Sequence, residues 1–152
     1  MTTFTYVGTY RGERERFGSR PATPADFAAI RRLDAEVNGV DRGRVVEGLP
    51  RFLAQLRVVE RGGVVTGYAG VWQNVDNLVV GPVVADSVAD AEALIGDIAA
   101  SVDGPVRLDL DDRYPQLHDW ATQHGFTLRT STAVMVHDGR PLPGTVVAGS
   151  SP

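Results

Sequence analysis

Apolar side chains recur at helical spacing in two well-defined segments of the chain. The segment 24–38 follows a threonine that can cap a helix and precedes a glycine that can end one. The segment 88–102 follows Ser87, and Asp90 stands at the third helical position, which is the spacing of a capping box. The predicted buried faces consist of Phe27, Ile30, Leu33 and Val37 in the first segment and Val88, Ala91, Leu94, Ile95, Ile98 and Val102 in the second.

Between these two helices, three valine-rich stretches have the pattern of antiparallel strands. The stretches 56–61 and 64–73 are separated by Gly62-Gly63, which favours a hairpin turn. The third stretch, 78–85, follows a polar turn of sequence NVDN. We therefore expect these strands to lie side by side.

The remaining elements follow from alternation and from glycine and proline positions. They are a second helix within 41–55 that begins at Asp41 and is broken or kinked near Gly48 and Pro50, a strand at 106–112, a short helix at 114–125, and closing strands at 126–130 and 132–138.

This order of elements predicts the fold class and the extent of the domain. The fold is α/β (α+β), with a mixed, mostly antiparallel central sheet of about six to seven strands flanked by about four helices. The main domain spans 19–138. We expect 1–18 to form an N-terminal arm or an edge strand, and 139–152, rich in Gly, Pro and Ser, to form a flexible tail.

Composition excludes several classes of function. The chain of 152 residues has no cysteine and only three scattered histidines, so we expect no disulfide, no thiolate metal site and no bound metal. A net charge of −4 provides no general attraction to nucleic acid or to acidic membranes. No stretch resembles a signal peptide or is long and apolar enough to cross a bilayer, so we expect a cytoplasmic protein.

The order of elements and several short motifs resemble the GNAT acyltransferase fold. The motifs RPATPADFAAIRRLD, VVERGGVVTGYAGV and WATQHGFTLRTSTAVMV resemble the first helix, the second and third strands, and the last helix with its Gly-Phe exit and final hairpin. Within this superfamily, NGVDRGRVVEGL, VGPVVADSVADAEALI and TAVMV are most similar to the C-terminal domain of two-domain bacterial members of the YitH/HolE type. The resemblance spans roughly 19–138.

The resemblance implies a donor site for acyl-CoA in a split between the strands at 78–84 and 106–110. The pyrophosphate would lie on backbone amides of a glycine-rich turn at the start of the next helix, where the helix dipole favours an anion. The implied cofactor-binding residues are Val80, Val83, Val84 and Ser87.

The corresponding turn in this chain departs from that pattern. It reads VADSVADA, without the basic residue or the glycines, and Asp86 and Asp90 would repel a pyrophosphate. Pro82 also removes a backbone amide from the strand beside the donor arm. We therefore expect acetyl-CoA or another acyl-CoA to bind weakly.

Candidate catalytic residues are few. The tyrosine that often protonates the departing thiolate in this superfamily is replaced by Ala121, and Tyr114 is too far upstream to take its place by alignment. His118 on the same predicted helix is suited to proton transfer, although most lone helical histidines are merely exposed. Asp76 can act as a general base, but the turn NVDN accounts for it equally well.

Candidate substrate-binding residues lie where the resemblance implies an acceptor site. Asp41 and Arg42 can bind a polar substrate or can simply cap a helix. Tyr68 and Trp72 share a strand face, followed by Gln73, and can form a pocket floor, part of the core or a dimer contact.

Three classes of function remain open. The first is an N-acyltransferase that acts on a small-molecule amine, with a degenerate pyrophosphate loop. The second is a domain that has lost CoA and binds a small molecule or catalyses another reaction, for instance in specialised metabolism. The third is a structural half that pairs with another GNAT domain or with a second copy of itself. Fold alone does not decide between them.

Overall fold

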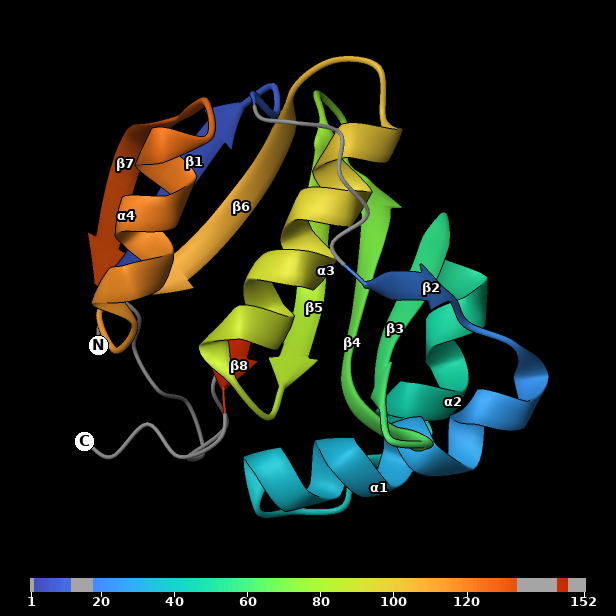
Figure 1. Ribbon diagram of the computed structural model, residues 1–152. Coiled ribbons are helices and arrows are strands. Elements are labelled where there is room, and N and C mark those ends of the chain that lie inside the picture. Colours follow the sequence, from blue (N-terminus) through green and yellow to red (C-terminus); the bar gives the residue numbers. More distant parts are fainter. Residues whose placement is uncertain (1, 12–17, 134–144, 148–152) are drawn as a thin grey trace.

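The computed structural model describes residues 2–11, 18–133 and 145–147 (Figure 1). Within these ranges a single eight-stranded sheet is flanked by four α-helices. The elements are β1 (Thr2–Gly8), β2 (Ser19–Pro21), the short 3-10 helix η1 (Pro24–Asp26), α1 (Phe27–Asn38), α2 (Gly43–Phe52), β3 (Gln55–Arg61), β4 (Val64–Gln73), β5 (Leu78–Ala85), α3 (Val88–Ser101), β6 (Val106–Asp111), α4 (Pro115–Gln123), β7 (Phe126–Ala133) and β8 (Thr145–Val147).

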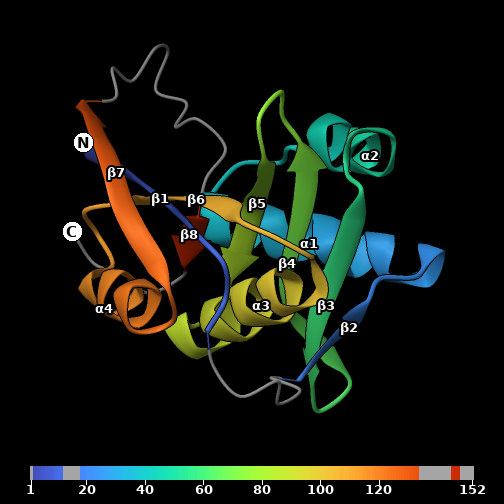
Figure 2. The same cartoon turned by 90° about the horizontal axis from the view of Figure 1, so that it is seen from above.

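The sheet is mixed and mostly antiparallel, so the predicted fold class is confirmed. Its strand order is β2-β3-β4-β5-β6-β1-β7, and β8 pairs with β5 off this path. Among the described strands, only β5 with β6 and β5 with β8 pair in parallel. Helices α3 and α4 cover one face of the sheet, and α1 and α2 cover the other (Figure 2).

The N-terminal strand lies inside the sheet. β1 pairs with β6 on one side and with β7 on the other, whereas the sequence predicted an arm or an edge strand for 1–18. The charged part of that segment, 12–17, lies outside the described residues. The preceding sequence TTFTYVG is β-branched and aromatic, which suits a strand with neighbours on both sides.

The C-terminal part also departs from expectation. β7 continues through Ser131 to Ala133, so the predicted strands at 126–130 and 132–138 form one strand as far as the described residues extend. β8 lies within the tail 139–152 that was predicted to be flexible, and Thr145 and Val147 are buried. The residues 134–144 and 148–152 lie outside the described part of the chain.

The helix α2 is continuous through the two residues that were expected to interrupt it. It begins at Gly43, and the Asp41 carboxylate accepts a hydrogen bond from the Gly43 amide at 2.8 Å. Pro50 lies in the last turn, and the helix ends two residues later at Phe52. Pro50 lacks the backbone N–H that would donate to the carbonyl four residues earlier, so the helix loses one hydrogen bond close to its end.

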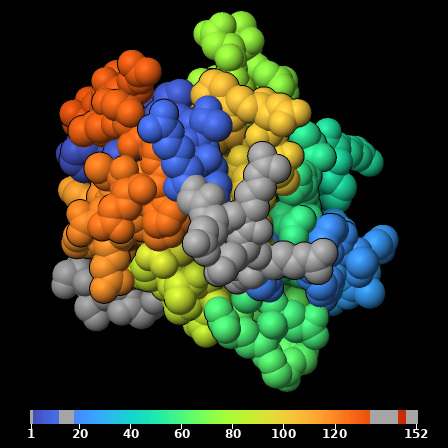
Figure 3. Space-filling view, turned by 45° about the horizontal axis from the view of Figure 1, so that its top comes forward, coloured from blue at the N-terminus to red at the C-terminus, as the bar shows by residue number. Residues whose placement is uncertain are grey.

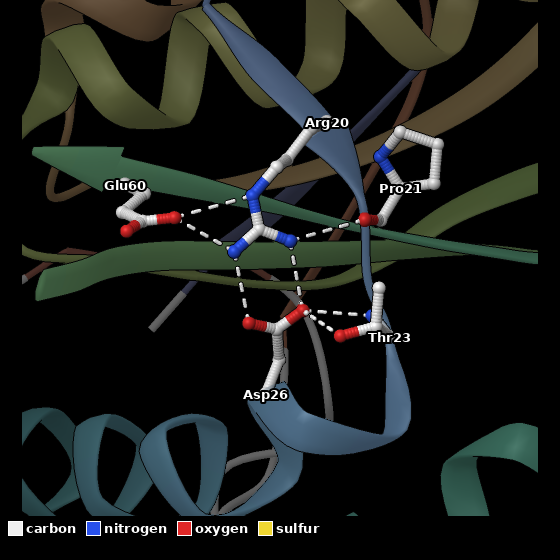
Figure 4. Close-up of polar contacts among 5 residues, drawn as sticks. All are labelled: Arg20, Pro21, Thr23, Asp26 and Glu60. Carbon is white, nitrogen blue, oxygen red and sulfur yellow. Dashed lines mark hydrogen bonds and ion pairs between the residues drawn. The ribbon is translucent and has the colours of Figure 1, made fainter. Parts of the chain in front are cut away.

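The entry to α1 is fixed by an arginine from the edge strand (Figure 4). Arg20 on β2 makes two hydrogen bonds to the Asp26 carboxylate, at 2.8 and 2.9 Å, and also contacts Glu60 of β3 at 2.8 Å. The same carboxylate accepts the Thr23 amide at 2.7 Å. The Arg20 guanidinium, assisted by Thr23, holds the pKa of the buried Asp26 carboxyl well below its usual range.

Replacing Asp26 with asparagine should therefore destabilise the protein in a pH-dependent way. The pKa of Asp26 is lower in the folded chain than in the unfolded chain, so its charged form stabilises the fold above the unfolded value, about 4, and this contribution is lost as the pH falls below it. Thermal melts should show a Tm deficit of Asp26→Asn at about pH 6 that narrows toward about pH 3. Asp103→Asn, on an exposed turn, provides the control; an Asp26→Asn deficit that is constant with pH would contradict the assignment.

Candidate functional site

The strands β5 and β6 run in parallel and then separate. Their pairing covers Leu78–Val80 and Val106–Leu108, and Figure 1 shows β6 turning away from β5 beyond this point. β8 lies against β5 in the gap, where Val83–Ala85 pair with Thr145–Val147. The predicted split is therefore present, and part of it is occupied by the chain's own backbone.

The start of α3 lies at the same end of the gap. The Ser87 hydroxyl accepts a hydrogen bond from the Asp90 amide at 3.2 Å, which confirms the predicted cap. Asp90 is 2% exposed, and its carboxylate accepts a hydrogen bond from Arg61 Nε at 2.7 Å. The helix terminus thus already holds a carboxylate and its counter-ion. Asp86 adds an exposed carboxylate immediately before the helix.

The three valines of β5 that the resemblance implies for cofactor binding lie before and after the point where β5 and β6 separate. Val80 pairs with Leu108 of β6, before the strands separate. Val83 and Val84 pair with Thr145 and Val146 of β8. All three valines are buried, so only their backbone edge would be available to a ligand that replaced β8.

Three neighbouring residues on β4, β5 and β8 lie on the face of the sheet that α1 and α2 cover. Tyr68 on β4 is the register partner of Val84, and Val84 is the partner of Val146. Side chains at paired positions of neighbouring strands share a face. Val84 and Tyr68 both belong to the apolar cluster beneath α1 and α2. Tyr68 is therefore a core residue, 1% exposed.

A buried polar network connects α1 to this face of the sheet. It is centred on Asp34 of α1, which is 0% exposed. Arg42 donates two hydrogen bonds to its carboxylate, at 2.8 and 2.7 Å, and the Tyr68 hydroxyl donates a further, short one. Burial, followed by the nearby Asp34 carboxylate, raises the pKa of Tyr68 far above its ordinary value. Arg42 and Tyr68 thus use their polar atoms within the protein.

The other residues predicted for substrate binding lie nearer the surface. Asp41 forms an ion pair with Arg31 at 3.1 Å, which lowers the pKa of its carboxyl. Trp72 is half-buried, and its ring lies 5.1 Å from that of the exposed Phe52. The Gln73 amide donates to the Asn74 carbonyl at 2.7 Å within the β4–β5 turn. Asp41 and Gln73 thus already have polar partners within the protein, and the substrate-binding role of these residues stays a prediction.

Asp76 occupies the exposed β4–β5 turn, which stands out from the molecular surface (Figure 3). It precedes Val83 by seven positions, a separation of about 23 Å along an extended chain. It therefore lies at the opposite end of β5 from the strand β8 and the start of α3.

His118 on α4 has a hydrogen-bond partner at each ring nitrogen. Its Nε2 lies 2.6 Å from the Asp111 carbonyl, and its Nδ1 lies 2.6 Å from the Tyr6 hydroxyl. Because a carbonyl can only accept, Nε2 carries the proton, and in the neutral ring Nδ1 accepts from Tyr6. His118 therefore joins β1, β6 and α4, and proton transfer through Nδ1 would require Tyr6 to move.

Sequence analysis did not identify two residues that make hydrogen bonds in this region, Asp34 and Tyr114. Asp34 lies four positions after Ile30 and three before Val37, on the buried face of α1, and a carboxylate at such a position indicates a buried partner. Tyr114 was set aside by its place in the alignment. Its hydroxyl nevertheless lies in the gap, where it accepts the Val147 amide at 3.0 Å.

The described residues contain neither a cluster of metal ligands nor a membrane-spanning helix. Across 2–11, 18–133 and 145–147, no three histidine, aspartate or glutamate residues gather as metal ligands. No helix in the same part of the chain has the length and apolar character needed to cross a bilayer.

Comparisons with known proteins agree with this architecture. The model of the acetyltransferase (GNAT) domain family matches residues 30–146. The uncharacterized N-acetyltransferase YitH of Bacillus subtilis (strain 168) is 29% identical over 102 residues, which are 66% of this chain and 36% of YitH. The chain therefore spans little more than a third of the length of this relative.

Solved structures show the same fold at low sequence identity. A GNAT-family protein from Novosphingobium aromaticivorans aligns over 86% of this chain and 61% of its own, with a TM-score of 0.64 and 13% identity. A GCN5-related N-acetyltransferase from Sphaerobacter thermophilus aligns over 86% of this chain and 49% of its own, with a TM-score of 0.58 and 15% identity. These similarities bear on the fold alone.

Proposed function

Because the chain belongs to the GNAT acetyltransferase domain family, we propose that it is an acyltransferase-like protein that acts on a small-molecule amine. Its donor site would be the gap between β5 and β6, and its seat for the CoA pyrophosphate would be degenerate. The observation that carries this proposal is the start of α3 at the mouth of the gap, with Asp90 and Arg61 already paired there. A pyrophosphate would have to approach that carboxylate without a glycine-rich turn.

The reaction would place definite demands on this site. The amine nitrogen attacks the thioester carbonyl, a C–N bond forms, the C–S bond breaks, the amine loses one proton and the thiolate gains one. The donor arm would lie along the backbone edge of Val83–Ala85. The Tyr114 hydroxyl lies beside that edge and can supply the proton to the thiolate. Asp76 and His118 remain proposals for the amine proton, at a greater distance and with an internal partner, respectively.

Measurement of acetyl-CoA binding tests directly whether the pyrophosphate-binding site is degenerate. Isothermal titration should show affinity weaker than micromolar, because Asp86 and Asp90 repel the pyrophosphate. Asp86→Gly removes one of these charges without disturbing the Asp90–Arg61 pair, and should raise the affinity by roughly tenfold. Asp103→Gly, at the other end of α3, should leave it unchanged. Micromolar binding by the unmodified protein, or no gain in Asp86→Gly, would contradict the proposal.

A second candidate function is favoured by the presence of β8 in the gap. In this alternative the domain has lost acyl-CoA and serves to bind a small molecule, to catalyse another reaction, or to pair with another GNAT domain or a second copy. The exposed ring of Phe52 beside Trp72 offers a contact for such pairing. The two candidates differ in whether the gap accepts a donor once β8 has left it.

A further inference from the structure

β8 completes the sheet at the place where β5 and β6 separate. Thr145 and Val147 are 3% and 5% exposed, and Val147 belongs to the core between the sheet and α3. The Val147 amide donates a hydrogen bond to the Tyr114 hydroxyl. β8 therefore occupies both the backbone edge and the hydroxyl that the proposed donor site would use.

Within the described part of the sheet, the backbone pairing of β8 involves one neighbouring strand. Its ladder to β5 extends over Val83–Ala85, which is short for a strand. The Thr145 hydroxyl is buried and has no hydrogen-bond partner among the described residues, which costs about 1–3 kcal/mol. Separating β8 from β5 should thus cost much less than unfolding the whole domain.

A pantetheine arm would need the edge of β5 that β8 covers. Pantetheine is an extended chain with amide groups, and such a chain can add to a strand edge in the way a peptide does. Both occupants would pair with the backbone of Val83–Ala85, so each excludes the other. We propose that β8 is an exchangeable occupant of the donor gap, which closes it in the resting protein and leaves when a pantetheine-bearing ligand enters.

Exchange of this kind would regulate access to the site. The apparent dissociation constant equals the intrinsic constant divided by the fraction of molecules in which β8 has left, so an open fraction of about 1% weakens binding about a hundredfold. The identity of the ligand rests on the proposed function. The opening of β8 does not, and it can be measured separately.

The absence of cysteine from the chain allows that opening to be measured with a single introduced thiol. In the full chain, Val147→Cys places a thiol on the buried face of β8, and Val58→Cys places a matched thiol in β3, 0% exposed. Val75→Cys, at a position 93% exposed, gives the rate of an unhindered thiol. Reaction with a thiol reagent should be about a hundredfold or more faster at position 147 than at position 58, because only the latter requires global unfolding.

The exchange is tested by adding S-ethyl-pantetheine, a thioether that cannot react with the thiol. A ligand that holds the gap open should raise the rate at position 147, by about threefold or more at several times its dissociation constant, and leave position 58 no faster. If the pyrophosphate adds little to the affinity, S-ethyl-CoA should raise the labelling rate at position 147 no more than S-ethyl-pantetheine does. Titration of both compounds into Val147→Asp, in which a buried charge expels β8, should show tighter binding than to the unmodified protein.

The remaining outcomes separate the two proposals. A thiol at position 147 that reacts as slowly as the one at position 58 would show that β8 is a permanent part of the core and would overturn the exchange. Measured binding of S-ethyl-pantetheine with an unchanged labelling rate would overturn it as well, while the donor site could stand elsewhere. Fast labelling at position 147, without binding of S-ethyl-pantetheine to the unmodified protein or to folded Val147→Asp, would overturn the proposed donor site. It would also overturn the proposed exchange of β8 with a ligand.

Discussion

Asp34→Ala should lower the free energy of unfolding by about 3 kcal/mol. The change leaves the Tyr68 hydroxyl buried without an acceptor and removes both hydrogen bonds from the Arg42 guanidinium. Breaking a buried ion pair by removing one partner costs about 3–5 kcal/mol. The lower end applies here because the Arg42 side chain is 22% exposed and can reach water.

Chemical denaturation of four variants checks this expectation. Asp76→Ala, on the exposed β4–β5 turn, removes an equal charge and should change stability by less than about 0.5 kcal/mol. Tyr68→Phe removes one hydrogen bond of the network. The double variant Asp34→Ala with Tyr68→Phe should lose less than the sum of the single losses, since the two side chains interact. A loss below about 1 kcal/mol in Asp34→Ala would show that Asp34 is not the centre of a buried network.

Gly125→Ala should destabilise the protein by about 2–4 kcal/mol. Gly125 follows the C-cap residue of α4 and has a φ of 97°, which alanine adopts only with strain. A Cβ at this position would also lie 2.5 Å from the Thr9 carbonyl oxygen, where β1 passes the α4–β7 turn. Backbone atoms cannot yield to such a contact as a flexible side chain can, so the two costs add.

The chain provides a matched control for the first of these costs. Gly104 has a φ of 107°, and an added Cβ there would meet no atom within 4 Å. Gly104→Ala should therefore cost only the backbone strain, about 1 kcal/mol. The difference in Tm between the two alanine variants measures the steric contribution of the close approach to Thr9. Equal losses in both variants would contradict that approach.

Local sequence patterns predicted most of the fold because they act within a few residues. Thr23 and Pro24 mark the start of η1, which leads directly into α1, Gly39 marks the end of α1, and Ser87 marks the start of α3. The valine-rich strands β3, β4 and β5 follow from alternation and from the turns between them. These features depend on backbone geometry that each short stretch determines for itself.

The positions of β1 and β8 could not be predicted in the same way. Thr5 of β1 reaches Asp109 of β6, 104 positions away, and nothing in the sequence near Thr5 identifies that partner. Thr145–Val147 are set among Gly, Pro and Ser residues, and their pairing depends on the gap left by β5 and β6. Partners that are distant in sequence are selected by the assembled sheet.

A local rule predicted one feature near the candidate site, the cap of α3. The Ser87 hydroxyl accepts the Asp90 amide as the spacing predicted, whereas the Asp90 carboxylate binds Arg61, a partner distant in sequence that no local rule identifies. Tyr114 was missed because it lies at the start of α4, where the alignment fixes the residue but not the direction of its side chain. Sequence spacing does not show which polar atoms already have partners, so the hydrogen bonds of Arg42 and Tyr68 to Asp34 could not be predicted.

The central position of β1 sets an order of events during synthesis. β1 precedes both of its neighbours in the chain, since β6 begins at Val106, 98 positions after Gly8, and β7 follows β6. Until these neighbours are made, β1 has no edge to join, and the half-sheet of β3, β4 and β5, whose contacts are local, can assemble without it. β1 thus joins the sheet late, once β6 and β7 are available on either side of it.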